Sequence, residues 1–189
     1  MNKTEAIRAV IDATGAEPVV FTTGFSCRIA RGIADRASHF YMTGSMGLAA
    51  DIGIGIALHS TVPVVVVDGD GSLAMNPGCL LTAGALPGLP LLHLLLDDRS
   101  YESTGGQHVP SERVDFCALA RAAGYAEVLC ADGIGDFREA LASGLTCSAP
   151  VFVHAVLAAP EGALPPPRID LGLDEVRRRF SDHLGLVVR

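Results

Sequence analysis

Apolar residues along the chain fall into two recurring patterns, short continuous runs and longer stretches with helical spacing. Residues 62–67 and 91–96 are almost entirely apolar, as expected of strands buried on both faces of a parallel sheet. Between such runs, apolar positions recur every three to four residues, the spacing of amphipathic helices. This alternation predicts a doubly wound α/β fold, with helices on both faces of one parallel sheet of about six strands.

The pattern predicts where most elements begin and end. Strands are expected at residues 18–22, 40–42, 62–67, 91–96, 125–129 and 151–156, and helices at 4–14, 28–34, 45–58, 77–85, 116–123, 134–145 and about 173–183. Thr4, Ser45 and Asp115 are candidate caps for the helices that follow them. The small residues of stretch 45–58 favour a helix that lies close to its neighbour. With no repeat or linker visible, residues 1–189 predict a single domain.

Two further segments are predicted to be irregular. Residues 101–110 form a polar, glycine-containing loop that is longer than an ordinary connection, which is typical of functional loops. Residues 158–169 are rich in proline and predict a crossing over the surface.

Charge and composition exclude several classes of protein. The 189 residues include 14 Lys and Arg against 21 Asp and Glu, so a nucleic-acid partner is not expected. The apolar runs are far shorter than the roughly 20 residues of a membrane span, and the N-terminus lacks a signal-peptide pattern, so we expect no membrane association and a cytoplasmic protein. Five cysteines without a C-x-x-C pair indicate neither a disulfide framework nor a zinc site. A hydrophobic content of 49 % with only 19 % charged residues predicts subunit contacts.

Acidic residues follow two neighbouring strands of the predicted sheet. Asp68-Gly69-Asp70-Gly71-Ser72 comes directly after one strand, and Asp97-Asp98 ends the next. Carboxylates at the same sheet edge, beside a glycine turn that lets a phosphate approach the backbone, are suited to holding Mg²⁺ against a diphosphate. Two plainer interpretations stay open at this point. The Asp-Gly pair is also typical of an ordinary turn, and Asp97 and Asp98 could be loop carboxylates that point into water.

Together these segments resemble the cofactor motif of thiamine-diphosphate-dependent 2-oxo acid decarboxylases. In that family a Gly-Asp-Gly sequence is answered by an Asn-Asn pair. The resemblance implies a metal held by Asp70, Asp98 and the backbone carbonyl of Ser100, with Gly71, Ser72 and Tyr101 in the cofactor site. Asp98 stands where the family has Asn. Its extra negative charge should attract the cation and repel the diphosphate.

Two other segments extend the resemblance. The stretch around Gly44, Ser45 and Met46 resembles the segment that receives the aminopyrimidine, with Met46 as the wedge beneath the bend of the cofactor. The resemblance also implies that Thr23 and Gly24 bind the diphosphate end. An ordinary strand end followed by a helix cap would explain these last two residues equally well.

Closer likeness points to a subgroup of this family. Residues 43–49, 67–78 and 103–107 are similar to sulfopyruvate decarboxylases, especially their short beta subunits, and to phosphonopyruvate decarboxylases. The likeness covers nearly the whole chain. It implies decarboxylation of a small anionic 2-oxo acid, with sulfopyruvate giving sulfoacetaldehyde and CO₂, or alternatively phosphonopyruvate giving phosphonoacetaldehyde. A noncatalytic phosphate- or nucleotide-binding module is a further alternative. A Rossmann dinucleotide site is disfavoured, because no Gly-x-Gly-x-x-Gly follows the first strand.

The resemblance also implies a partner chain. In the family, the glutamate that activates the cofactor belongs to a separate pyrimidine-binding domain, and no glutamate here lies in a similar context. We therefore expect no confident catalytic residue in this chain and a separate alpha subunit, in a heterotetramer or larger assembly with the cofactor at the interface. Gln107 and His108 are candidates for a substrate loop.

Overall fold

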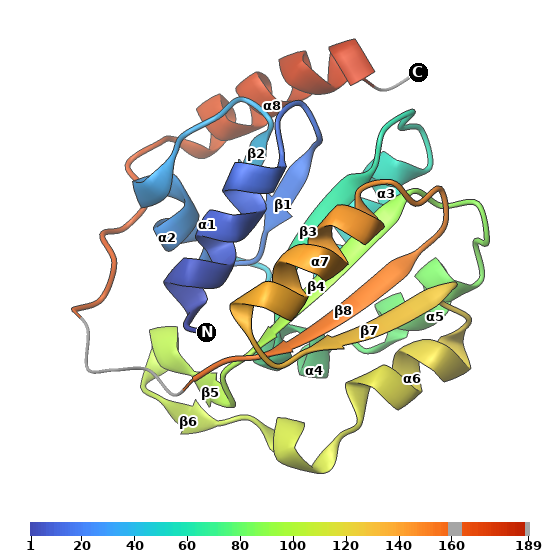
Figure 1. The fold of residues 1–189 in the computed structure, drawn as a ribbon. Helices are drawn as coiled ribbons and strands as arrows, with labels where there is room; N and C mark the ends of the chain where they lie inside the picture. Colours follow the sequence, from blue (N-terminus) through green and yellow to red (C-terminus); the bar gives the residue numbers. More distant parts are fainter. Residues whose placement is uncertain (159–163, 188–189) are drawn as a thin grey trace.

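A six-stranded parallel sheet forms the centre of the molecule in a computed structural model that describes residues 1–158 and 164–187 (Figure 1). The strand order is β2-β1-β3-β4-β8-β7, and each neighbouring pair is parallel. The strands are β1 (Val19–Phe21), β2 (His39–Tyr41), β3 (Val64–Gly69), β4 (Leu91–Asp97), β7 (Glu127–Ala131) and β8 (Val151–Val156). The predicted fold class is confirmed, and each predicted strand is present within about two residues.

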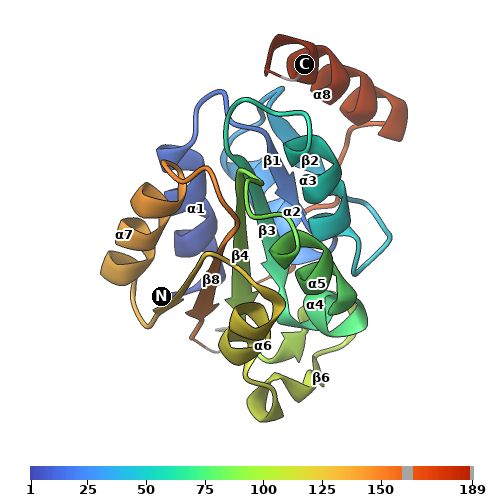
Figure 2. The same ribbon diagram turned by 90° about the vertical axis from the view of Figure 1, so that its right-hand side faces the viewer.

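Helices cover both faces of the sheet, as Figure 2 shows edge-on. One layer contains α1 (Lys3–Ala13), α2 (Phe25–Ile33) and α7 (Ile134–Gly144), and the other contains α3 (Ala49–Ala57), α4 (Asp70–Met75), α5 (Gly78–Gly84) and α6 (Phe116–Ala123). The last helix, α8 (Leu173–Val187), packs beside the edge strand β2, where Phe180 contacts Phe40. It extends four residues beyond the predicted end.

The central strands are buried from both sides. Val64, Val65, Val66 and Val67 are each 0 % exposed, with alternate side chains entering the two apolar clusters on opposite faces. Burial on both faces explains why this strand is a continuous apolar run rather than an alternating one. Helix α3 lies very close to it, because a Cβ on Gly53 would overlap Cγ2 of Val66. The small residues of this helix therefore have the role that the sequence predicts.

Several helix starts differ from the prediction. Asn2, rather than Thr4, caps α1 through a reciprocal capping box with Glu5. Helix α3 begins at Ala49, so Ser45 does not cap it and instead adopts a φ of 57°. Asp115 caps α6 as predicted. Helix α4 was not predicted, because the Asp-Gly residues at its start favour a turn in isolation.

The long loop after β4 contains regular structure. Strands β5 (Ser100–Tyr101) and β6 (Gln107–His108) form a small hairpin around the 3₁₀ turn η1 (Glu102–Thr104), and η2 (Pro110–Arg113) follows. The described part of the predicted crossing, residues 158 and 164–169, contains no helix or strand, and residues 159–163 lie outside the described residues. None of the helices described is both long and apolar enough to cross a membrane.

Candidate functional site

A pocket opens at the carboxyl ends of β1, β3 and β4. It is lined by residues 22–26, 69–72 and 100–103, together with Lys3, Met46, Leu96 and Asp98. Strand β1 lies between β2 and β3. The chain passes from β1 to β2 on one side, and then crosses over to β3 on the other side of β1. Such a switch in strand order is where open α/β sheets bind ligands. The fold therefore places the pocket where the acidic segments end.

Asp70 is the first residue of α4 and is 2 % exposed. Its Oδ2 accepts a hydrogen bond of 3.1 Å from the Ser111 hydroxyl of η2. Burial and the nearby carboxylates of Asp97 and Asp98 raise the pKa of Asp70 well above its ordinary value. A crowded buried carboxylate of this kind is stabilised by a neighbouring cation.

Asp97 and Asp98 are buried, at 3 % and 9 % exposure, so the interpretation of both as solvent-facing loop carboxylates is wrong. Asp97 is held from two sides, by His154 Nε2 at 2.9 Å and by the Arg99 N–H at 3.1 Å. Burial would raise the pKa of Asp97, but its hydrogen bond to His154 helps to lower it. Asp97 thus fixes the turn after β4 rather than lining the pocket.

Asp98 does line the pocket. Its Oδ2 lies 2.6 Å from Lys3 Nζ, in an ion pair with the start of the first helix. Arg99, the next residue, has a φ of 62°. This left-handed residue separates Asp98 from Ser100, and both of these flanking residues line the pocket.

The glycine of the Gly-Asp-Gly motif that follows Asp70 makes room for an aromatic ring. A Cβ on Gly71 would overlap Cε1 of Tyr101. Larger residues would therefore displace Tyr101 from the pocket wall. Ser72, the next residue, accepts hydrogen bonds from the Thr22 hydroxyl and the Gly47 N–H, each at 3.1 Å. This hydroxyl joins the ends of β1 and β3 to the loop after β2.

The end of β1 supplies backbone donors. Thr23 and Gly24 line the pocket, and α2 starts at Phe25. Gly24 has a φ of 104°, and a Cβ there would meet Ser103 Oγ at 3.1 Å. The free N–H groups of a helix start are suited to an anion.

Other predicted site residues lie at or beyond the rim of the pocket. Met46 is half-buried and lines it, whereas Gly44 and Ser45 are exposed and do not. Gln107 and His108 are exposed on β6 and are not part of the pocket wall. The structure therefore brings Thr23, Gly24, Met46, Asp70, Gly71, Ser72, Asp98, Ser100 and Tyr101 together and leaves four predicted residues outside.

The donor set fits a hard divalent cation bound together with a diphosphate. Within residues 1–158 and 164–187, no group of three or more His, Cys, Asp and Glu side chains forms a complete metal site. Mg²⁺ does not need one, since it is usually bound by one or two carboxylates together with phosphate oxygens and water. Asp70 and Asp98 would supply the carboxylates, and the start of α2 would supply donors for the phosphates.

Four residues around the site were missed in the sequence. Lys3 and Glu102 line the pocket, and Ser111 and His154 hold its aspartates. None belongs to a local motif, and Lys3 and Glu102 are separated by 99 positions. Their proximity follows only from the fold.

Comparison with known proteins shows the family to which the chain is similar. The model of the thiamine pyrophosphate enzyme C-terminal TPP binding domain matches residues 22–155. A phosphonopyruvate decarboxylase of Streptomyces viridochromogenes is 45 % identical over 163 residues, which cover 86 % of this chain and 41 % of the relative. The sulfopyruvate decarboxylase subunit beta of Methanothermobacter thermautotrophicus is 39 % identical over 180 residues, which cover 95 % of this chain and 94 % of that subunit.

Solved structures share the fold. A thiamine diphosphate-dependent 4-hydroxybenzoylformate decarboxylase from Rhodococcus jostii superimposes with a TM-score of 0.71 at 19 % identity, over 86 % of this chain and 33 % of that chain. The chain thus spans about two fifths of the phosphonopyruvate decarboxylase and a third of this larger enzyme, but nearly the full length of the separate beta subunit.

Proposed function

This chain belongs to the family of thiamine pyrophosphate enzymes, as their C-terminal TPP-binding domain, and we therefore propose that it is the diphosphate-binding subunit of a decarboxylase. Its substrate is a small anionic 2-oxo acid, with sulfopyruvate as the first choice. One observation carries the proposal. Asp70 and Asp98 line the same pocket as the Thr23-Gly24 loop, in a chain that matches a sulfopyruvate decarboxylase beta subunit over 94 % of its length.

The pocket residues divide between the metal and the diphosphate. Asp70, Asp98 and the carbonyl of Ser100 hold Mg²⁺, since hard oxygen ligands suit this ion. Thr23, Gly24 and Ser72 face the diphosphate, with the N–H groups at the start of α2 as donors.

The remaining site residues shape the cofactor's other end. Gly44, Ser45 and Met46 receive the aminopyrimidine, and Tyr101 packs against Gly71 to form the pocket wall. When bound, thiamine diphosphate supplies a nucleophilic ring carbon and accepts the electron pair left behind as CO₂ departs. The contribution of this chain is to anchor and orient that group through its metal and phosphates.

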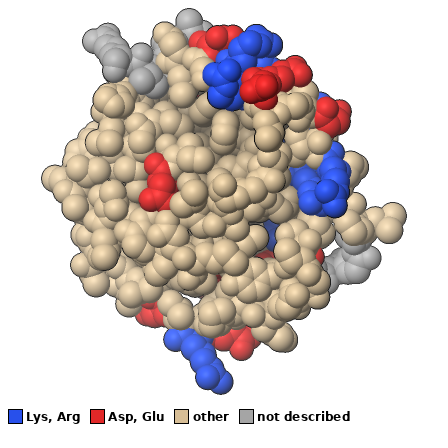
Figure 3. Space-filling view, turned by 180° about the vertical axis from the view of Figure 1, so that it is seen from behind, with Lys and Arg blue, Asp and Glu red and all other residues tan. Residues whose placement is uncertain are grey.

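A second subunit completes the site. The pocket lined by Asp70 and Asp98 has a volume of about 40 Å³, far below the roughly 300 Å³ at the lower end of small-molecule sites. The face formed by α3, α4 and α5 is largely uncharged, as Figure 3 shows, and exposes Leu48, Met75 and Leu81. We assign this face to an alpha subunit that brings the activating glutamate, in a heterotetramer or larger assembly.

Phosphonopyruvate is the second candidate substrate, favoured by the 45 % identity to a phosphonopyruvate decarboxylase. Purified with its alpha subunit, the chain is to be given each acid, and the CO₂ and aldehyde formed are to be measured with and without Mg²⁺ and thiamine diphosphate. We expect turnover that depends on both additions and is faster with sulfopyruvate. Faster turnover of phosphonopyruvate would overturn the substrate assignment.

Binding measurements without any activity assay can distinguish a decarboxylase subunit from a noncatalytic phosphate- or nucleotide-binding module. Isothermal titration of the full chain with thiamine diphosphate should give heat that depends on Mg²⁺. Binding of a nucleotide in its place, or binding that ignores Mg²⁺, would favour the module over the decarboxylase subunit.

A further inference from the structure

Lys3, near the N-terminus, places a positive charge in the pocket, far in sequence from the other residues that line it. It is the first residue of α1, and its ammonium group pairs with Asp98 Oδ2 at 2.6 Å and with the Glu102 carboxylate. The three side chains are 17 %, 4 % and 19 % exposed. Ion pairs that are this far removed from water are less screened than surface pairs.

The pocket would otherwise carry only negative charge. Asp70, Asp98 and Glu102 line it, and of its described lining residues Lys3 is the only cationic side chain. A lysine amine is ordinarily charged at neutral pH, where a diphosphate carries several negative charges.

The pair also orients Asp98. A carboxylate has two oxygens, and the ion pair with Lys3 occupies Oδ2. Oδ1 is left for a cation in the pocket. An Asn at this position that gave its oxygen to the cation would turn its NH₂ group toward the ammonium, and neither group accepts a hydrogen bond. Lys3 and Asp98 are thus matched in charge.

We infer that Lys3 is a positioning residue of the diphosphate pocket, which orients Asp98 toward the metal and offsets the negative charge of Asp98 and Glu102 so that a diphosphate is accepted. The inference rests on the proposed function and deepens it. A purely structural role, in which Lys3 only fastens α1 to the hairpin, would change folding stability and leave anion binding untouched.

The test uses inorganic pyrophosphate, which probes the diphosphate pocket of this chain without needing a partner subunit. The full-length chain is titrated calorimetrically at saturating Mg²⁺, and urea unfolding is measured on the same samples. Lys3→Met should weaken pyrophosphate binding about tenfold, a typical effect for losing one charge-assisted contact. Lys3→Arg, which keeps the charge, should stay within about threefold of the unmodified chain.

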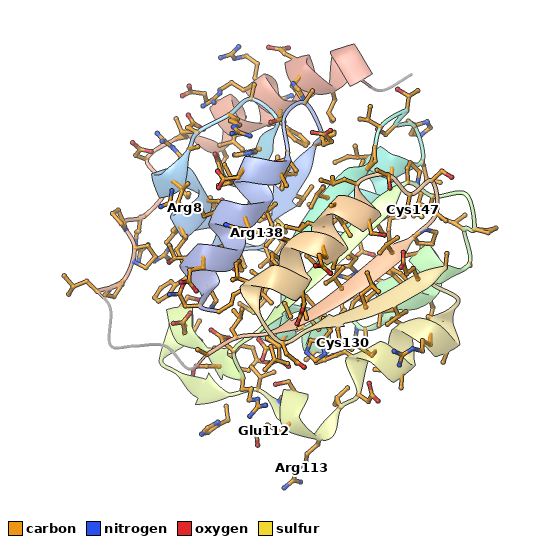
Figure 4. The ribbon with its side chains drawn as sticks, in the orientation of Figure 1. Arg8, Glu112, Arg113, Cys130, Arg138 and Cys147 are labelled. Atoms are coloured by element: carbon orange, nitrogen blue, oxygen red, sulfur yellow. The ribbon has the colours of Figure 1, made fainter. Side chains whose placement is uncertain are left out.

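Arg8→Met is the matched control, because Arg8 is an exposed cation on the same helix (Figure 4). It should leave pyrophosphate binding unchanged. In an Asp98→Asn background, the loss caused by Lys3→Met should shrink to about threefold or less, since part of the charge that Lys3 offsets is gone.

Two results would overturn the inference. One is binding by Lys3→Met equal to that of the unmodified chain. The other is an equal loss on Lys3→Met in the unmodified chain and in the Asp98→Asn background, which would mean that Lys3 does not act through Asp98. Failure of the unmodified chain to bind Mg²⁺ with pyrophosphate or thiamine diphosphate would instead refute the proposed function, so the two failures are distinguishable.

Discussion

Two aspartates lie at the end of β3 and two at the end of β4, and the roles of the two residues are divided in the same way at both ends. The first aspartate of each pair, Asp68 or Asp97, is paired with a histidine, whereas the second, Asp70 or Asp98, lines the pocket. Nearby acidic residues with similar sequence contexts thus have different roles. One anchors the strand end, and the other is available to a ligand.

The two histidine pairs differ in their surroundings. Asp68 and His93 are 1 % and 0 % exposed, and the ring of His93 is also bonded to the Tyr125 hydroxyl at 3.1 Å. His154 is partly open, with a side chain that is 16 % exposed, and its partner Asp97 lies close enough to Asp70 to raise the pKa of that residue. The first pair is therefore part of the core, and the second supports the site. If this distinction is correct, substitutions at the first pair should mainly lower stability, and substitutions near the second should mainly weaken cofactor binding.

The largest effect is expected for His93→Leu. Removing the histidine leaves the buried Asp68 Oδ2 and the Tyr125 hydroxyl without their polar neighbour, which typically costs about 3 kcal/mol. Urea unfolding should show this loss in the free energy of unfolding, while Mg²⁺-dependent binding of thiamine diphosphate by the folded protein changes less than about twofold. His59→Leu, at an exposed histidine, is the control and should be nearly neutral. A loss of binding with intact stability would reverse the roles assigned to the two aspartates.

Asp70→Ala should do the opposite of His93→Leu, weakening cofactor binding without lowering stability. Loss of one carboxylate ligand should weaken Mg²⁺-dependent binding of thiamine diphosphate about 100-fold in a calorimetric titration. The free energy of unfolding should not fall, because the substitution relieves repulsion with Asp97 and Asp98. Asp12→Ala, at an exposed aspartate of α1, provides the comparison. Unchanged affinity in Asp70→Ala would remove this residue from the metal site.

A second buried histidine, His39, extends the comparison because no carboxylate is bonded to its ring in the described residues. His39 is 2 % exposed and contacts the Tyr41 hydroxyl at 3.2 Å. Burial, with a smaller effect of Arg36, lowers the pKa of His39 to about 4. Between pH 6.5 and 4 the unfolded chain therefore binds a proton that the folded chain does not, and stability decreases as the pH falls.

The contribution of His39 to this decrease should be on the order of 2 kcal/mol. Urea unfolding at about pH 7 and about pH 4.5 measures it, and His39→Leu should lose less stability over this interval than the unmodified chain. Equal losses in both proteins would show that His39 is not the group responsible.

The smallest effect is expected for His154→Leu. Asp97 would keep the Arg99 N–H as a donor, so the free energy of unfolding should fall by only about 1 kcal/mol. Because Asp97 would then hold the turn before Asp98 less firmly, cofactor affinity should fall about fivefold. His154→Gln retains a donor and should recover part of the affinity. A stability loss as large as that of His93→Leu would make the two pairs equivalent.

Much of the fold could be predicted because it depends on local patterns. Buried parallel strands need continuous apolar runs, so residues 62–67 and 91–96 identified the two central strands. The acidic motifs could be placed at one sheet edge for the same reason, since parallel strands end on the same side. Helix starts were less predictable. Asn2 and Thr4 are both good caps, and only the capping box with Glu5 distinguishes them.

The order of the elements, and the acidic residues that reach the edge of the sheet, can be read from the chain alone, because side-chain periodicity and turn chemistry act over a few residues. The choice of which aspartate in each pair meets a histidine and which meets the pocket was made by the three-dimensional packing. The same packing puts Lys3 beside Asp98 and Glu102. These arrangements depend on contacts between distant segments, whose partners are fixed by how helices and strands pack together rather than by any local motif.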